Sequence, residues 1–532
     1  MTDTGTLNFL WSQHLVAGFT AAGARHAVIS PGSRSTPLAL ALLRQSRIRC
    51  EVVVDERCAA FFALGVARAT RQPVLLLATS GSAPANWLPG VIEASQAGVP
   101  LLLLTADRPP ELQGCGANQT IDQTALFGPY LRARHLLAAP YAGFAPARLA
   151  ALAAQASAEA SGPLPGPVHL NLPFREPLLP SGDCPPLAMP PTVRVTAAAR
   201  APEAAAVGEL ARRLDRRPGF IVCGELPATP GFAESVTALA AALDCPLLAE
   251  PLSGLRFGRH DRSRLAVRYA DWLAAAPSGE WLLRFGAFPV TRILQQFVAR
   301  PRPLHVLVDP WPRWNDPAHQ LSDLLHSDPA AFCRALLAEK PLPAGAAWHA
   351  AFARQEAAAR ADGGAIAALL AALPDGIPLF VGNSLPIRDL DRHSGSADQG
   401  PVIHANRGAS GIDGNLSTAL GIAAAAGRVV ALVGDLTCQH DIGGLALAAG
   451  RDAVVVVVNN GGGGIFAELP QAALPEFERG WKTPQTLDFS HAAKAFGLAF
   501  ATADAPAALT AAVAQALAAG GPHLIEWRET SA

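Results

Sequence analysis

The sequence predicts an α/β protein of three doubly wound parallel-sheet domains, and three observations carry this prediction. Short apolar runs show little polar alternation, which is typical of strands buried on both faces of a parallel sheet. Alanine-rich stretches of helical length separate these runs. Two proline-rich segments, at 178–193 and 340–345, divide the chain into three parts. We therefore expect repeated strand–helix–strand units with two linkers.

Each expected domain follows this pattern. The first, at 1–182, has strands expected at 27–30, 51–54, 74–77, 101–104 and 168–172, with crossover helices at 59–69 and 85–97. The central domain, at 195–339, has strands expected at 220–223, 281–284 and 305–308. The third, at 346–532, has strands expected at 379–381, 429–433, 453–458 and 523–526.

Composition excludes several classes of protein. The 532 residues include 42 Lys and Arg against 43 Asp and Glu, which argues against nucleic-acid binding through a broad basic field. Hydrophobic residues make up 50% of the chain, enough for several cores. We expect no membrane span and no secretory signal. Eight cysteines without a Cys-x-x-Cys pair indicate reduced thiols in a cytoplasmic enzyme.

The third domain carries a candidate phosphate and metal site. The expected strand 429–433 runs into Gly434-Asp435, and the next strand ends in Asn459, Asn460 and four glycines. Parallel strands end at one sheet edge, where ligands bind. Oxygen ligands suit Mg²⁺ or Ca²⁺ carrying a phosphate, and glycines let the backbone approach that phosphate. Either piece alone is more often an ordinary turn or loop. Phe466 stands where a dinucleotide fingerprint needs glycine.

At this spacing the pair resembles the Gly-Asp…Asn motif of thiamin diphosphate enzymes. The resemblance implies that Asp435, Asn460 and the backbone carbonyl of Gly462 hold Mg²⁺ or Mn²⁺ on the diphosphate. Many of those enzymes have Gly-Asp-Gly, where this chain has Leu436.

Thiamin diphosphate chemistry also needs a carboxylate beside the pyrimidine ring, in an apolar pocket. Glu56 follows the expected buried strand 51–54 and begins a helix, which fits that role. The alternative is that Asp55 or Glu56 only caps the helix.

Further motifs make the resemblance closer. They lie at 29–38, 55–57, 79–83, 104–112, 115–119, 382–384, 406–414 and 460–466. Together they resemble the 2-succinyl-5-enolpyruvyl-6-hydroxy-3-cyclohexene-1-carboxylate (SEPHCHC) synthases of menaquinone biosynthesis. The match covers the first and third domains in order, whereas the central domain matches only in general pattern.

The resemblance implies a thiamin diphosphate-binding fold with pyrimidine-binding, central and diphosphate-binding domains. It implies a transferase that decarboxylates 2-oxoglutarate and adds the resulting succinyl carbanion equivalent to isochorismate in 1,4 fashion. The product is SEPHCHC, which retains the enolpyruvyl ether, and CO₂ is released.

The resemblance also implies roles for individual residues. Ile412 would prop the bent cofactor, Asn383 and Ser384 would contact it, and Ile465, Phe466 and Leu469 would line its diphosphate side.

Both substrates are dicarboxylates, which guanidinium groups hold through paired hydrogen bonds. The 2-oxoglutarate side would comprise Gln119, Ser384, Arg388 and Arg407. The isochorismate side would comprise Ser33, Arg34, Arg108, Asn118 and Arg292. Relatives often have Lys-Arg where this chain has Thr291-Arg292, so one positive charge is absent there. The four arginines 34, 108, 388 and 407 are expected in loops at strand ends.

Two alternatives stay open at this stage. One is another thiamin diphosphate carboligase or decarboxylase, similar to acetohydroxyacid synthase, for which the arginine set is excessive. The other is a catalytically silent binding protein, although Glu56 and Asp435 are both present. Because these two residues lie in different domains, and relatives place the cofactor between two subunits, we expect a homodimer or a dimer of dimers.

Overall fold

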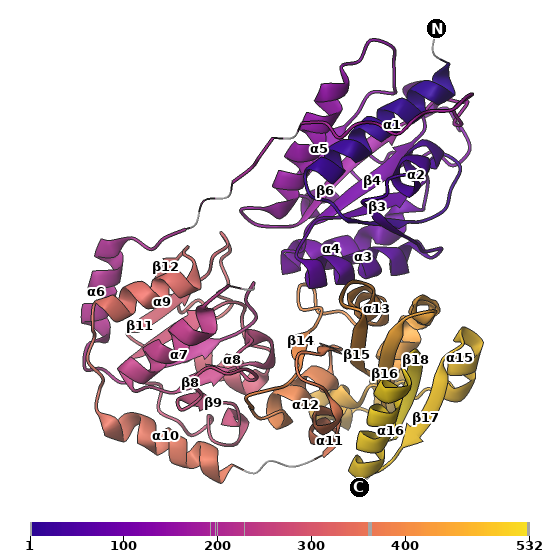
Figure 1. Ribbon diagram of the computed structural model, residues 1–532. Helices are drawn as coiled ribbons and strands as arrows, with labels where there is room; N and C mark the ends of the chain where they lie inside the picture. Colours follow the sequence, from indigo (N-terminus) through magenta and orange to yellow (C-terminus); the bar gives the residue numbers. More distant parts are fainter. Residues whose placement is uncertain are drawn as a thin grey trace.

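The computed structural model describes residues 3–191, 193–196, 198, 200–227, 229–359 and 364–528. The remaining positions of the expected domains and first linker lie outside the described residues. The described chain forms three six-stranded sheets, each with all strands parallel and helices on both faces (Figure 1). The prediction of three doubly wound parallel-sheet domains is confirmed. The boundaries at 182, 195, 339 and 346 stay predictions.

The first sheet has the strand order β2-β1-β3-β4-β6-β5. Its strands are β1 (His26–Ile29), β2 (Arg49–Val52), β3 (Val74–Ala78), β4 (Leu101–Asp107), β5 (Ala133–Leu136) and β6 (Pro167–Pro173). One face is covered by α1 (Thr4–Ala21), α2 (Thr36–Leu43) and α5 (Pro146–Ser161). The other is covered by α3 (Glu56–Thr70) and α4 (Leu88–Ala97).

One expectation about this sheet is wrong. The run at 51–54 is not a strand buried on both faces, because β2 ends at Val52 and lies at the edge of the sheet. Val52 is 57% exposed and Val54 is 81% exposed. Apolar composition alone does not distinguish a central strand from an edge strand that another surface can cover.

The central sheet has the order β9-β8-β7-β10-β11-β12, which is the dinucleotide-fold order. Its strands are β7 (Gly219–Cys223), β8 (Leu247–Ala249), β9 (Leu265–Ala266), β10 (Trp281–Phe285), β11 (Leu304–Val308) and β12 (Asp323–Leu325). Its helices are α6 (Ala204–Leu214), α7 (Phe232–Leu243), α8 (Arg292–Val298) and α9 (Pro329–Ala338). α10 (Ala346–Ala358) follows the second linker yet packs Trp348 and Phe352 against Phe220 of this sheet.

The third sheet, β14-β13-β15-β16-β18-β17, repeats the order of the first. Its strands are β13 (Pro378–Val381), β14 (Val402–His404), β15 (Arg428–Gly434), β16 (Asp452–Asn459), β17 (Ala499–Ala503) and β18 (Pro522–Arg528). Its helices are α11 (Gly364–Ala372), α12 (Leu385–His393), α13 (Asn415–Ala426), α14 (Asp435–His440), α15 (Phe489–Phe496) and α16 (Pro506–Ala519). In such sheets a ligand crevice opens where the strand order reverses, here between β13 and β15.

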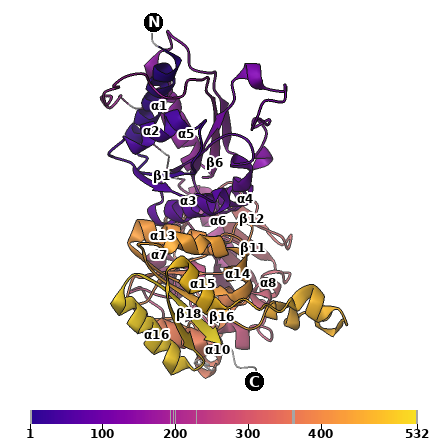
Figure 2. The same cartoon turned by 90° about the vertical axis from the view of Figure 1, so that its right-hand side faces the viewer.

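The first and third domains share one continuous hydrophobic core through α3 and α13, which lie side by side in both views (Figures 1 and 2). The helices approach closely because glycines face each other at the crossing. A Cβ on Gly65 would collide with the carbonyl of Thr418, and one on Gly421 with the carbonyl of Phe62. This crossing fixes the two domains against each other within one chain.

Candidate active site

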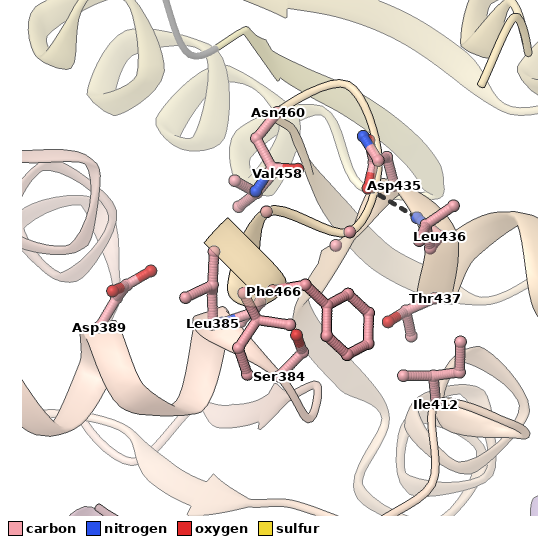
Figure 3. A pocket seen from close by; sticks show the side chains of 16 residues that line it. Ser384, Leu385, Asp389, Ile412, Asp435, Leu436, Thr437, Val458, Asn460 and Phe466 are labelled. Atoms are coloured by element: carbon pink, nitrogen blue, oxygen red, sulfur yellow. Dashed lines mark hydrogen bonds between the residues drawn. The ribbon is translucent and has the colours of Figure 1, made fainter. Parts of the chain in front are cut away.

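A pocket opens at the reversal point of the third sheet, between the segments that follow β13, β15 and β16 (Figure 3). All sixteen residues that line it belong to the third domain. They include Ser384, Ile412, Asp435, Asn460 and Phe466, which come from four separate segments of sequence. The fold therefore builds this pocket at the sheet edge where ligands are expected.

Asp435 joins two of these segments. It begins α14 directly after β15, and its side chain is 4% exposed. Oδ1 accepts the Leu436 N–H at 2.7 Å, and Oδ2 accepts the Gly462 N–H at 2.7 Å. Burial raises the pKa of Asp435, and the backbone hydrogen bonds partly offset this effect. The Gly-Asp and Asn-Gly segments thus meet at one carboxylate.

Asn460 and the glycine loop complete the polar side of the pocket. The Asn460 Oδ1 atom is buried and has no hydrogen-bond partner within the described residues. Gly462 has a φ of +125°, and a Cβ there would collide with the carbonyl of Lys482, so only glycine fits. The Gly462 carbonyl accepts the Gly464 N–H at 2.9 Å and keeps its second lone pair.

These oxygen atoms are suitable ligands for a magnesium ion that carries a phosphate. Mg²⁺ prefers oxygen ligands and usually takes one or two carboxylates together with phosphate oxygens. The described residues contain no group of three or more His, Cys, Asp or Glu that could hold a metal alone. A buried amide oxygen without a partner, beside a single carboxylate, suits an ion whose other ligands come from a diphosphate.

The apolar side of the pocket is formed by Ile412, Ile465 and Phe466. Leu469, predicted beside them, is not among the lining residues and follows the short 3₁₀ helix η7 (Gly464–Glu468). Ser384 also lines the pocket and has a φ of +74°, a left-handed conformation that is strained for serine.

Two predicted arginines lie beside this pocket without lining it. Asn383 is 2% exposed and accepts Arg407 Nη1 at 2.6 Å on its Oδ1. Arg388 lies in helix α12, not in a loop as expected, and its Nη1 donates to the Ser384 carbonyl at 2.6 Å. Burial, followed by the charge of Arg407, lowers the pKa of Arg388. Two cations held this close together favour an anionic ligand between them.

A second group of predicted residues gathers at the edge of the first sheet. Arg34 is 5% exposed, and it donates to the Phe174 carbonyl and to Glu176 Oε1, each at 2.8 Å. Arg108 Nε donates to the Asn118 carbonyl at 3.2 Å. Gln119 has a φ of +55° and donates to the Ser80 carbonyl at 2.8 Å. Burial and the nearby charge of Arg108 lower the pKa of Arg34, so these two guanidinium groups are neighbours. Ser33 is exposed at the same edge.

Glu56 is the first residue of α3 and does not cap it. The Asp55 side chain accepts the N–H groups of Arg57 and Cys58, at 2.9 and 3.2 Å. Within the part of the chain that the structure describes, the Glu56 side chain has no hydrogen bond or ion pair, and it does not line the pocket. Its carboxylate is therefore available to a group outside this chain's own fold.

Arg292 remains apart from both groups. It is exposed at the start of α8 in the central domain. The preceding Thr291 has a buried Oγ1 atom without a partner among the described residues. The residues brought together in one chain thus form two sets, one on each sheet edge, with Arg292 in neither.

The structure adds residues that sequence reasoning missed. Leu385, Asp389, Thr437 and Val458 also line the pocket. The spacing of Leu385 and Asp389, four residues apart on one helical face, was an available signal.

No helix of the described residues is long and apolar enough to cross a membrane.

Family comparisons agree with the two site-bearing domains. Residues 11–126 match the thiamine pyrophosphate enzyme N-terminal TPP binding domain. Residues 391–527 match the thiamine pyrophosphate enzyme C-terminal TPP binding domain. Both matches support thiamin diphosphate as the cofactor. The fold is similar to that of benzoylformate decarboxylase from Polynucleobacter necessarius, with a TM-score of 0.73, 20% identity and 98% of each chain covered.

Curated relatives extend the similarity to the whole chain. A protein of Dechloromonas aromatica (strain RCB) named SEPHCHC synthase is 59% identical over 99% of this chain and 100% of its own length. One of Geobacillus kaustophilus (strain HTA426) with the same name is 41% identical over 98% of this chain and 95% of its own. This chain therefore belongs to the family of SEPHCHC synthases, within the thiamine pyrophosphate enzymes.

Proposed function

We propose that the enzyme releases CO₂ from 2-oxoglutarate and joins the remaining four-carbon unit to isochorismate by 1,4-addition, giving SEPHCHC. The observation that carries this proposal is the full-length similarity to curated relatives with that name. The site supports it, because four arginines lie at the two sheet edges, enough for two dicarboxylates.

Asp435, the Asn460 amide oxygen and the Gly462 carbonyl would hold Mg²⁺, or Mn²⁺, on the diphosphate. The N–H groups of the glycine loop and the apolar side chains of Ile465 and Phe466 would complete that contact, with Leu469 beyond them. Bound thiamin diphosphate supplies the electron sink for decarboxylation and carbon–carbon bond formation. Ile412 lines the pocket where it could support the bent cofactor, next to Asn383 and Ser384.

Glu56 would hold and move a proton at the pyrimidine ring nitrogen. It lies beside exposed Val52 and Val54, so a second surface covering this edge would give the carboxylate an apolar setting. Because the pocket is lined only by the third domain, we propose that Glu56 comes from a second copy of the chain. The assembly is then a homodimer, or a dimer of dimers, with shared sites.

The arginines would bind the substrate carboxylates. Arg388 and Arg407, with Ser384 and Gln119, would take 2-oxoglutarate. Arg34, Arg108, Ser33, Asn118 and Arg292 would take isochorismate. Arg34 can exchange its partner at low cost, because the Glu176 side chain that pairs with it is 70% exposed and returns readily to water. The proposal places the enzyme in the cytoplasm, where its eight free cysteines stay reduced.

The test is an assay of the purified protein with 2-oxoglutarate, isochorismate, thiamin diphosphate and Mg²⁺, with products identified by mass. We expect CO₂ and an adduct of the succinyl unit with isochorismate. Formation of acetolactate in a parallel assay supplied with pyruvate, with no such adduct in the first, would favour an acetohydroxyacid synthase-like carboligase. Cofactor binding without any turnover would favour a silent binding protein.

The metal assignment has its own test. Asp435→Ala should weaken Mg²⁺-dependent binding of thiamin diphosphate, measured by calorimetry, by at least the ~10–100-fold that loss of an outer-shell partner costs. Binding at wild-type concentrations of both would contradict the assignment.

A further inference from the structure

Glu93 of the first domain holds a loop of the third domain by its backbone. It lies in α4 and is only 3% exposed. Its Oε1 atom accepts the Gly408 N–H at 2.7 Å, and its Oε2 atom accepts those of Ala409 at 2.6 Å and Ser410 at 3.4 Å. The bond to Gly408 joins residues 315 positions apart in the sequence. Hydrogen bonds to an ionised carboxylate are among the strongest in proteins.

The held loop connects β14 to α13, and it contains Arg407 and Ile412 on either side of the bound amides. On its other side, Asn383 Nδ2 donates to the carbonyls of Asn406 at 2.8 Å and Gly411 at 2.7 Å. The backbone between Arg407 and Ile412 is therefore held by a carboxylate from the first domain and by an amide from the third.

The packing around the carboxylate is tight, and a guanidinium group lies beside it. A Cβ on Gly408 would lie 2.5 Å from the Glu93 carbonyl oxygen and 2.7 Å from the Ala97 nitrogen, so the loop lies directly on the α4 backbone. Arg68 Nη2 is 3.6 Å from Glu93 Oε1, and Arg68 Nη1 is 3.0 Å from Glu225 Oε1 in the central domain. Residues of all three domains thus meet behind this loop.

We propose that Glu93 is a positioning residue, which sets the place of Arg407 and Ile412 by holding the backbone between them. This inference rests on the proposed function, in which Arg407 binds 2-oxoglutarate and Ile412 supports the cofactor. Glu93 touches neither substrate nor cofactor and acts only through the loop. Small misplacements of binding groups can cost ~10²-fold in rate, even from substitutions far from the chemistry.

The test variant is Glu93→Gln, which places an amide N–H against the N–H groups of the loop. We expect the KM for 2-oxoglutarate and the half-saturating concentration of thiamin diphosphate to rise by about tenfold or more, and kcat to fall by up to ~10²-fold. The KM for isochorismate should be unchanged, because its proposed contacts lie outside this loop. Hydrogen exchange at the amides of 408–410 should become faster.

Glu356→Gln is the matched control. In the wild type, Glu356 Oε1 likewise accepts two consecutive backbone N–H groups, of Val267 and Arg268, both at 2.7 Å in the central domain. We expect this variant to show faster exchange at 267–268 with unchanged kinetic constants. If Glu93→Gln does not fold, Gly408→Ala serves as a second test variant. Its added Cβ should displace the loop from α4, raise the KM for 2-oxoglutarate and leave the KM for isochorismate unchanged.

Two outcomes overturn the proposal. One is faster exchange at 408–410 with both KM values and cofactor binding unchanged. The other is an equal rise in both KM values, as general destabilisation would give. If the wild type forms no adduct, the proposed function fails instead. Glu93 is then judged by exchange and by calorimetric binding of thiamin diphosphate with Mg²⁺, and unchanged binding in Glu93→Gln overturns its role.

Discussion

The first and third sheets have the same strand order, yet they differ at the side where their strands end and ligands are expected. These two sides, which we call the first and third edges, differ in how many of their binding groups one chain supplies. At the third edge, Asp435 joins two segments, Asn460 presents an unpartnered oxygen, and a pocket is enclosed by one domain. At the first edge, Glu56 stands beside Val54, which is 81% exposed.

The difference agrees with what the proposed function requires each edge to bind. A diphosphate is held by backbone N–H groups and a metal, which one glycine loop and two strand ends can supply. A proton-transfer carboxylate needs an apolar enclosure, and an open sheet edge cannot enclose its own side chain. Within one chain, α3 and α13 connect the two domains through their helical faces, which leaves Val52 and Val54 exposed beside the first edge.

The largest expected effect comes from removing the charge at the first edge. Glu56→Gln keeps the size and polarity of the side chain but cannot exchange a proton as a carboxylate does. We expect thiamin diphosphate to bind with nearly wild-type affinity in calorimetry, while turnover falls by about 10²–10⁴-fold. Near-normal turnover would exclude Glu56 from the mechanism.

Mixing two inactive variants tests whether the edges meet between chains. Glu56→Gln damages the first edge, and Asp435→Ala damages the third. Under conditions that exchange subunits, random pairing should leave about a quarter of all sites intact and restore a corresponding activity. Either variant incubated alone is the control. If labelled subunits exchange and no activity returns, each cofactor is bound within one chain.

Much of the third edge could be predicted from sequence, because strand ends and glycines leave local signals. Asp435 and Gly462 are 27 positions apart, but the parallel topology requires their strands to end side by side. Glu93 left no such signal. Its role depends on a helix and a loop 315 positions apart, and no periodicity or motif encodes that contact.

The exposure of β2 could not be predicted either. The apolar run at 52–54 resembles a buried central strand, and only the structure shows that β2 ends at Val52 and lies at the edge of the sheet. Arg388 was misplaced for a related reason. Its motif indicates a strand end, but α12 begins at Leu385, early enough to include it.

The glycine crossing between α3 and α13 can be tested by a single methyl group. Gly421→Ala places a Cβ against the Phe62 carbonyl and should destabilise the protein by about 1–3 kcal/mol. Thermal unfolding measures this effect. Gly480→Ala is the control, because a Cβ there meets nothing within 4 Å, and it should change stability by less than about 0.5 kcal/mol. Equal stability of the two variants would show that the crossing does not fix the domains.

The smallest expected effect concerns Glu250, a buried carboxylate of the central domain beside its contact with the third domain. Glu250 is 1% exposed, and its Oε1 atom accepts the Val290 N–H. Burial, with the charge of Asp391 adding to it, raises the pKa of Glu250 to about 8 from an ordinary 4.5, and the charges of Arg256 and Arg407 oppose the shift. Between pH 4.5 and about pH 8, the folded protein therefore binds more protons at Glu250 than the unfolded chain does. This residue accordingly destabilises the fold increasingly as the pH rises through that window, by up to about 1.4 kcal/mol per pH unit.

Glu250→Gln removes this titration and can still accept the Val290 N–H. The Tm of the variant minus that of the wild type should therefore become more positive from pH 5 to pH 8. Glu203→Gln, at an exposed position before α6, controls for the loss of one carboxylate. A difference that stays constant with pH would mean that Glu250 is ionised in the folded protein throughout. The carboxylate would then join Asp391 in balancing the positive charges of Arg256 and Arg407, where the central domain meets the third.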